Sequence, residues 1–144
     1  MLPHILRNRW IFTYPVIIDN MMNLELLFLA TKLTGDSTYY NIACSHAKKT
    51  IENHLREDYS QYHVVDYDTL SGNVIKKMTS QGFADESTWA RGQAWGIYGF
   101  TMCYRETRNP EFLKTAKVMN ECFIKHPNMP DDYIPYWDFN DKNI

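Results

Sequence analysis

A repeat of 73 residues is the feature that most constrains the fold of this 144-residue chain. Asn109 lies 73 positions after Asp36, and the same shift carries Ala43 to Ala116. Two further pairs match at this spacing, namely Tyr39 with Phe112 and Leu27 with Phe100. A period of this length accommodates two helices and a loop, a unit that buries little apolar surface until it stacks on a neighbour. The sequence therefore predicts an all-α chain of stacked helical hairpins.

Capping residues and apolar periodicity place the two hairpins. Asp19 or Asn20 can cap a helix that ends near Gly35, and Asp36 opens its partner. The second hairpin begins with a helix from Ser87 or Thr88 to about residue 105. It continues with a helix that Asn109 and Pro110 start and Pro127 stops. The apolar stripes of three of these helices are Met22, Leu26, Leu29 and Leu33; Ala43, Ala47, Ile51 and Leu55; and Phe112, Ala116, Met119 and Phe123.

The helical period is lost between Glu57 and Glu86. Residues 62–67 can form a short strand, residues 71–73 a turn and residues 74–78 the returning strand. Long loops of this kind inside a helical protein are more often functional than incidental. We therefore expect a possible short β-hairpin next to a functional site.

Composition excludes several classes of partner. The chain is 44% hydrophobic and 22% charged with a net charge of −2, which leaves no basic field for nucleic acid. No apolar run reaches the roughly 18 residues of a membrane span, and the first residues lack a secretory signal, so we expect a cytoplasmic protein. No metal or other cofactor is predicted, because the histidines have no partners at metal-ligand spacing. The scattered cysteines, which predict free thiols, are Cys44, Cys103 and Cys122.

Residues 87–100 combine glycines and aromatic residues in an unusual way for a helix. Glycine costs roughly 1 kcal/mol relative to alanine inside a helix, so Gly92, Gly96 and Gly99 predict close approach by another group. One interpretation is a tightly packed core helix with a surface arginine. The other is the rim of a ligand site, where indole plates beside the Arg91 guanidinium suit a sugar that carries a carboxylate.

Four segments of the chain, in order, resemble the unsaturated glucuronyl hydrolases, glycoside hydrolase family 88. They are Ile-Ile-Asp-Asn-Met-Met-Asn-Leu-Glu-Leu-Leu at 17–27, Tyr62-His63 with Ser80-Gln81-Gly82, Thr-Trp-Ala-Arg-Gly-Gln-Ala-Trp-Gly-Ile-Tyr-Gly-Phe at 88–100, and Pro135-Tyr136-Trp137-Asp138-Phe139. Related unsaturated rhamnogalacturonyl hydrolases usually carry Asn-Gly in place of Gln93-Ala94. The resemblance implies an (α/α)6 barrel, of which residues 1–144 form an incomplete part. The chain is then a fragment, or other chains supply the remaining hairpins.

The resemblance also assigns roles to individual residues. Asp19 matches the catalytic acid/base, although a plain helix cap is the alternative from the residues alone. His63 matches a histidine that binds sugar hydroxyls, although a solvent-facing strand histidine is equally compatible with its position. The other matched residues are Gln81 near the reacting carbon or the attacking water, Arg91 on the uronate or a ring hydroxyl, and Trp89 and Trp95 as pocket walls. Trp137 and Asp138 are expected to shape a rim loop.

The implied substrate is a lyase-generated oligosaccharide that ends in a uronic acid with a C4=C5 double bond. Protonation of C4 and addition of water at C5 give a hemiketal, which opens and releases the neighbouring sugar. Family members also use an aspartate upstream of the position of Asp19, and this chain has no counterpart for it. We therefore expect the isolated chain to be weakly active or inactive. Two alternatives stay open, an unsaturated rhamnogalacturonyl hydrolase and a non-catalytic helical module that binds sugars or proteins.

Overall fold

A computed structural model of the chain describes residues 12–141. It contains four helices, α1 (Asn20–Thr34), α2 (Ser37–His54), α3 (Ala90–Thr107) and α4 (Pro110–Ile124). Three strands, β1 (Pro15–Ile17), β2 (Val64–Tyr67) and β3 (Val74–Met78), form an antiparallel sheet in the order β1-β2-β3. The prediction that a secretory signal is absent falls on the first residues, which lie outside this range. His4 also lies outside it.

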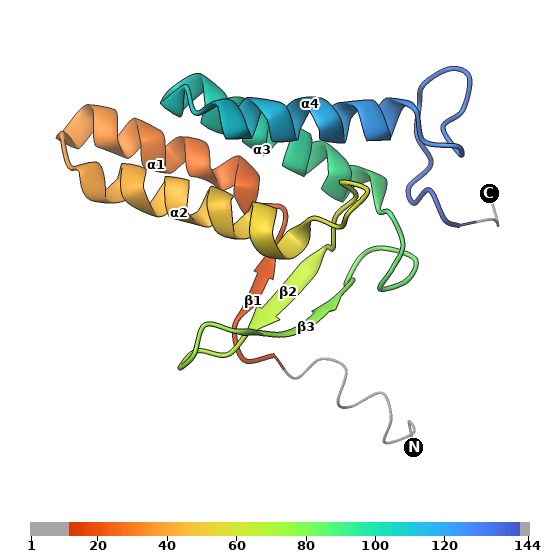
Figure 1. Ribbon diagram of the computed structural model, residues 1–144, viewed down its shortest axis with the longest axis horizontal. Coiled ribbons are helices and arrows are strands. Elements are labelled where there is room, and N and C mark those ends of the chain that lie inside the picture. The colour runs from red at the N-terminus through yellow and green to blue at the C-terminus, as the bar shows by residue number, and fades with distance from the viewer. Residues whose placement is uncertain (1–11, 142–144) are drawn as a thin grey trace.

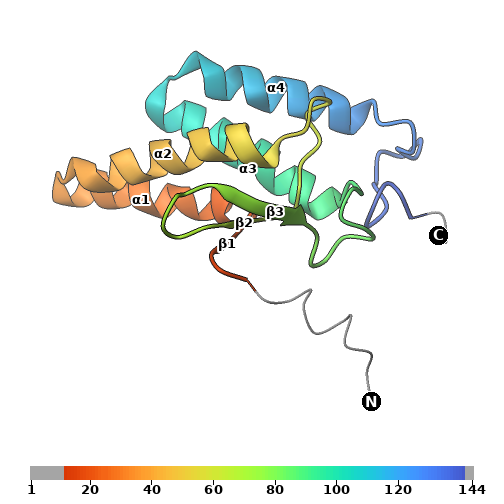
Figure 2. The same cartoon turned by 60° about the horizontal axis from the view of Figure 1, so that its bottom comes forward.

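The helices form two hairpins, α1–α2 and α3–α4, which pack together mainly through α1 and α3 (Figure 1). The sheet lies at the end of the bundle where α1 begins and α2 ends. Figures 1 and 2 both show the chain after α4 returning toward the start of α3. This end of the bundle therefore gathers segments that lie far apart in the sequence.

The predicted repeat is confirmed at the connections between the helices. Gly35 and Arg108, 73 positions apart, end α1 and α3 in the left-handed conformation with φ values of 74° and 57°. The next residue in each hairpin caps the following helix. Asp36 Oδ1 accepts from the Thr38 amide at 2.8 Å, and Asn109 Oδ1 accepts from the Glu111 amide at 3.0 Å. Equivalent backbone and side-chain geometry thus recurs at equivalent positions.

The core lies between the hairpins, and its buried residues include Phe28, Ala43, Ala47, Phe100, Phe112, Ala116 and Met119. Glycines allow α1 and α3 to approach closely. A Cβ atom on Gly99 would lie 2.5 Å from Met21 Cβ, a distance at which the two helices would have to separate. The predicted close approach at these glycines is confirmed. Its physical cause at Gly99 is packing between two helices of this chain.

The apolar stripe of α1 does not face this core. Leu26 is 69% exposed and Leu33 is 77% exposed, and Met22 and Leu29 are exposed as well. The core face of α1 consists instead of Met21, Leu24 and Phe28. Since α1 also contacts α2 and α3 through that inner face, the stripe is a second apolar face of the same helix.

The predicted β-hairpin is confirmed as β2 and β3, and the third strand is a feature that sequence reasoning missed. β1 has only three residues, too few to display the alternation that marks a strand. Asp66, buried in β2, accepts from the backbone amides of Thr13 at 3.0 Å and Tyr14 at 2.8 Å. This carboxylate holds the chain just before β1 against β2 and so positions the residues that follow β1.

No described helix combines the length and apolarity that crossing a membrane requires. Cys44, Cys103 and Cys122 are free thiols in the structure. Among residues 12–141, no three His, Cys, Asp or Glu side chains lie together in an arrangement that could hold a metal ion.

Candidate active site

Asp19 lies at the junction between β1 and α1, at the N-cap position. A capping side chain normally accepts from a backbone amide of the first turn, and its residue adopts an extended backbone. Asp19 instead has φ −56° and ψ −26°, and its side chain makes no capping hydrogen bond. The interpretation of Asp19 as a plain helix cap is therefore wrong. Its carboxyl group is available for another role.

His63 is held opposite Asp19 by the sheet. The amide of Ile18, the residue before Asp19, donates to the His63 carbonyl at 3.0 Å. This bond places His63 Nε2 3.7 Å from Asp19 Oδ2, with the histidine side chain almost fully buried. The predicted histidine and the predicted acid/base therefore face each other. The alternative of a solvent-facing strand histidine is wrong.

The opposite side of the His63 ring determines where its hydrogen lies. The backbone amides of Ser80 and Gln81 both donate to His63 Nδ1 at 3.1 Å. Because Nδ1 accepts these bonds, a neutral ring carries its hydrogen on Nε2, which faces Asp19. Sequence reasoning missed these two amides, since backbone groups in an irregular loop leave no residue-type signal.

Burial sets the charge state of His63. Burial lowers the pKa of His63, the nearby Asp19 carboxylate partly opposes this shift, and the Arg91 cation lowers the pKa further. The ring is therefore neutral near pH 7. Within residues 12–141, Asp19 Oδ2 and His63 Nε2 are buried and have no hydrogen-bond partner, because 3.7 Å is too long for such a bond. Unpaired buried polar atoms in a native protein often mark a functional site.

Trp89, Arg91 and Gln81 extend the site away from this pair. The Trp89 ring lies 4.4 Å from the His63 ring between centroids, and the Arg91 guanidinium lies 4.7 Å from the Trp89 ring centroid. Arg91 Nη2 donates to Gln81 Oε1. Five of the six predicted site residues thus form a continuous series of contacts. This series runs from the partly buried carboxyl group of Asp19 to the exposed cation of Arg91.

Trp95 lies in the second turn of α3 and is half-buried. Its ring meets Tyr98 edge-on, with 6.3 Å between ring centroids. The structure records no ring contact between Trp95 and His63 or Trp89 among the described residues, so its role as a pocket wall stays a prediction.

An open pocket of about 500 Å³ adjoins the outer end of this series. Its lining includes Gln81, Trp89 and Arg91 from the site, Phe123 from α4, and Tyr136 and Trp137 from the C-terminal loop. The predicted rim role of Trp137 agrees with its place in the lining of this pocket. A second cavity, of about 530 Å³, lies between α2 and the sheet and contains none of the predicted site residues.

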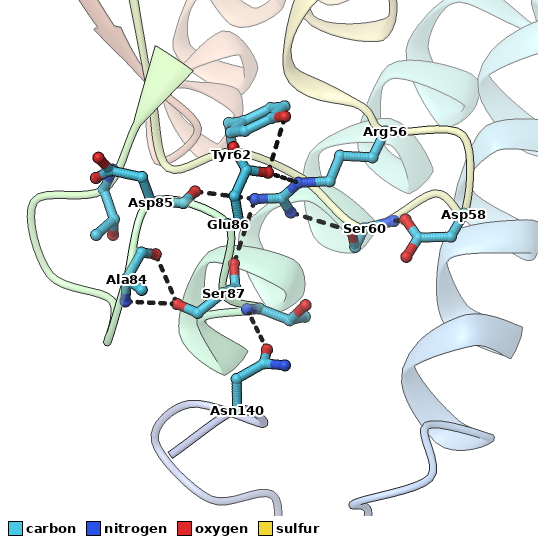
Figure 3. Close-up of polar contacts among 11 residues, drawn as sticks. Arg56, Asp58, Ser60, Tyr62, Ala84, Asp85, Glu86, Ser87 and Asn140 are labelled. Carbon is cyan, nitrogen blue, oxygen red and sulfur yellow. Dashed lines mark hydrogen bonds and ion pairs between the residues drawn. The ribbon is translucent and has the colours of Figure 1, made fainter.

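Sequence reasoning also missed Arg56, which lies just after α2 and carries no motif signal. Arg56 Nη1 donates to Ser60 Oγ at 3.0 Å, and Nη2 donates to the Asp85 carbonyl at 3.1 Å (Figure 3). Its guanidinium also lies 3.9 Å from the Tyr62 ring centroid. Arg56 therefore ties the end of α2 to the loop that precedes α3.

The fold is a bundle of helical hairpins with a carboxyl–histidine pair at one end, and comparison with known proteins identifies its relatives. No family model matches the chain. An unsaturated glucuronyl hydrolase of Formosa agariphila is 56% identical over 137 residues, which cover 95% of this chain and 34% of that protein. The crystal structure of an unsaturated glucuronyl hydrolase specific for heparin is 49% identical with a TM-score of 0.91 and covers 92% of this chain and 36% of its own.

A third relative was crystallised with a sugar. A variant of the unsaturated glucuronyl hydrolase of Streptococcus agalactiae, complexed with dGlcA-GalNAc6S, is 39% identical with a TM-score of 0.72. The match covers 85% of this chain and 32% of that one. The predicted resemblance is confirmed: this chain is homologous to the unsaturated glucuronyl hydrolases and has the fold of part of their barrel. It spans about a third of the length of these relatives.

Proposed function

We propose that this chain forms the acid/base part of an active site that removes a C4=C5 unsaturated uronic acid from lyase-generated oligosaccharides. The observation that carries the proposal is the pair formed by Asp19 and His63, in which an uncapped, partly buried carboxyl group faces a tautomer-fixed histidine at 3.7 Å. The names of the relatives, and the disaccharide bound to one of them, support the substrate class. We place the chain in glycoside hydrolase family 88.

In this reaction Asp19 acts first as an acid. Its proton goes to C4, the C4=C5 electron pair forms the new C–H bond, and an oxocarbenium ion develops at C5. Asp19, now a carboxylate, takes a proton from the water that adds to C5. The resulting hemiketal opens and the neighbouring sugar leaves. A single carboxyl group thus gives and regains one proton. The rule that relates the distance between two glycosidase carboxyl groups to retention or inversion at the anomeric carbon therefore does not apply.

His63 supports the charged form of Asp19 in this cycle. Its Nε2–H faces the carboxyl group, so a small movement of either side chain forms a hydrogen bond when Asp19 loses its proton. Because its pKa is lowered, the ring stays neutral and does not compete as a proton donor. Because Nε2 is buried, a sugar hydroxyl reaches this N–H only when a neighbouring side chain moves.

Arg91 and Gln81 are suited to the carboxylate end of the uronic acid. Arg91 is exposed and its guanidinium carbon lies over the Trp89 indole, 4.7 Å from the ring centroid, so this contact helps to orient the cation before the ligand arrives. Gln81 accepts one of its N–H groups, which leaves the others to pair with a uronate or a hydroxyl. The Trp89 ring offers an apolar surface between this cation and His63.

The activity requires more of the barrel than this chain supplies. The chain spans about a third of its relatives, and family members use a further aspartate upstream of the residue that matches Asp19. We therefore propose that the isolated chain turns over weakly or not at all. We also propose a cytoplasmic location, which the three free cysteines support.

The proposal is tested by following the ultraviolet absorbance of an unsaturated chondroitin disaccharide, which disappears as the double bond is hydrated. The assay compares the 144-residue chain with a chimera in which this chain replaces the matching section of the Formosa agariphila relative. We expect the chimera to be active and its Asp19→Asn variant to be slower by at least about 10²-fold. Asp131→Asn, an exposed aspartate in the C-terminal loop, is the control. An Asp19→Asn chimera as fast as its parent would contradict the proposal.

A further inference from the structure

The loop between β3 and α3 carries the predicted Gln81 and the two backbone amides that sequence reasoning missed. Residues 79–89 contain neither helix nor strand, yet they supply Gln81 and the two amides that bind His63 Nδ1. The bonds within the loop are short range. Gly82 donates to Thr79 Oγ1 at 2.7 Å, and Thr79 donates to Asp85 Oδ1 at 2.9 Å. Bonds of this range shape the loop but do not attach it to the rest of the molecule.

Asp138 attaches the loop from the side of the C-terminal segment. This residue is fully buried, and its Oδ2 accepts from the Phe83 amide at 2.9 Å and from Ser87 Oγ at 2.7 Å. Its Oδ1 accepts from the Asn140 amide at 3.0 Å. A buried carboxylate with three donors makes charge-assisted bonds that are stronger than neutral ones.

Backbone pairing holds Asp138 itself in place. The Ala90 amide donates to the Trp137 carbonyl at 3.1 Å, and the Phe139 amide donates to the Thr88 carbonyl at 3.0 Å. These two bonds hold residues 137–139 of the C-terminal segment against the start of α3, one on each side of Asp138. The position of the carboxylate is thus fixed relative to Trp89 and Arg91, which belong to the same helix start.

Arg56, just after α2, also contacts this loop (Figure 3). Its Nη2 donates to the carbonyls of Asp85 and Ser87, at 3.1 and 3.4 Å. Ser87 therefore receives Arg56 at its backbone and offers its hydroxyl to Asp138. A cation and an anion from two distant segments hold the same short stretch of loop.

We propose that Asp138 is a positioning residue: by holding Phe83 and Ser87, it keeps the Ser80 and Gln81 amides on His63 Nδ1 and so fixes the Nε2–H that faces Asp19. The proposal rests on the proposed function of the Asp19–His63 pair. Among the described residues, the Asp138 carboxylate contacts the loop at Phe83 and Ser87, and its third bond goes to Asn140 in its own segment. Gly82 lies against the same carboxylate, since a Cβ there would be 3.1 Å from Asp138 Oδ2.

The test uses the full 144-residue chain labelled with ¹⁵N and no substrate. Long-range ¹⁵N–¹H correlation reports which ring nitrogen of His63 carries hydrogen, and amide exchange reports the loop. Asp138→Asn places an NH₂ group where an oxygen accepted hydrogen bonds. We expect the single Nε2–H tautomer of the parent to become a mixture, and the Ser80 and Gln81 amides to exchange roughly tenfold faster or more. The matched control Asp131→Asn should change neither signal.

If Asp138→Asn does not fold, Ser87→Ala carries the same two readouts, because it removes the hydroxyl that lies 2.7 Å from Asp138 Oδ2 and also bonds Ala84 within the loop. A folded variant that keeps the parent's helical signals, a single His63 tautomer and slow loop amides would overturn the proposal. These readouts need no turnover, so they stay informative if the disaccharide assay fails. If the single Nε2–H tautomer of His63 is lost while the NMR signals of α3 stay unchanged, Asp138 positions the loop and does not merely support the fold.

Discussion

Gly99 shows how one residue sets the distance between the two hairpins. Its Cα faces Met21 in α1, and a Cβ atom there would collide with Met21 Cβ at 2.5 Å and lie tightly against the Met21 backbone at 3.2 Å. We expect Gly99→Ala to lower the free energy of unfolding by about 1–3 kcal/mol, despite the higher helix propensity of alanine, because overpacking outweighs propensity here. Urea denaturation measures the change. Thr101→Ala, at an exposed position of the same helix, should change the stability by less than about 0.5 kcal/mol.

Single residues also show what the sequence could and could not predict about the site. Asp19, His63, Gln81, Trp89 and Arg91 were identified because they match family segments, and the structure brings them into one series of contacts. The residues alone left Asp19 open between cap and acid, because an aspartate before a helix suits both. Only the backbone angles and the missing capping bond separate the two.

The supporting residues could not be predicted in this way. Arg56 and Asp138 act through backbone carbonyls and amides in an irregular loop, and such bonds depend on how the loop folds rather than on residue spacing. Asp138 was expected only to shape a rim. The structure shows it buried beneath the loop, with Trp137 beside it at the pocket.

Among the elements, the contact between α2 and β1 should respond to pH through His54. This residue ends α2, is 1% exposed, and its Nε2 lies 3.2 Å from the Val16 carbonyl. Burial is the main cause that lowers the pKa of His54 to about 4, and the bond to Val16 partly opposes it. The folded protein therefore keeps His54 neutral at a pH where the unfolded chain is already protonated.

This difference makes the protein less stable in acid. The unfolded chain binds the proton as the pH falls below about 6.5, whereas the folded protein binds it only near pH 4. The contribution of His54 to the free energy of unfolding is therefore complete above about pH 6.5 and is lost as the pH falls to about 4. The loss attributable to His54 is about 3 kcal/mol. Burial also lowers the pKa of His46 and His63, which adds to the loss in the same direction.

The comparison variant is His54→Gln, which can still donate to Val16 but does not titrate. We expect the parent to lose more free energy of unfolding than His54→Gln when urea denaturation is repeated at pH 7 and pH 4.5. Equal losses in the two proteins would show that His54 is not protonated on unfolding.

At the level of the elements, the sequence predicted the helices and their ends well. Asp36, Asn109 and Pro110 have side chains with strong positional preferences, and each lies where those preferences place it. The start of α3 was predicted two or three residues too early, because Trp89 pairs with Asp138 in an extended bridge before the helix begins. That pairing joins residues about fifty positions apart, which local propensity does not reveal.

The whole molecule presents an apolar face that its own core does not use. Met22, Leu26, Leu29 and Leu33 line the exposed side of α1. Periodicity identified this stripe correctly but could not say what covers it. The chain spans about a third of the length of its relatives. We propose that this exposed apolar face packs against another part of the barrel, because exposed apolar patches often mark interfaces.

This face gives a prediction for the isolated chain and for the chimera. The double variant Leu26→Lys with Leu33→Lys should leave the stability of the isolated chain within about 0.5 kcal/mol and reduce its self-association, since both side chains are exposed. In the chimera the same two charges should be buried and should prevent assembly of the barrel. Sedimentation and urea denaturation measure these effects. A chimera that folds equally well with both lysines would show that the stripe stays exposed.

The reaction at Asp19 is tested most directly by the structure of the released product. The chimera is incubated with an unsaturated chondroitin disaccharide in D₂O, and proton NMR follows the olefinic hydrogen at C4. Hydration predicts that this signal disappears at the rate at which the neighbouring sugar is released, with deuterium added at C4, and that Asp19→Asn stops both changes. Release of the sugar while the olefinic signal persists would mean attack at the anomeric carbon, which would contradict the role proposed for Asp19.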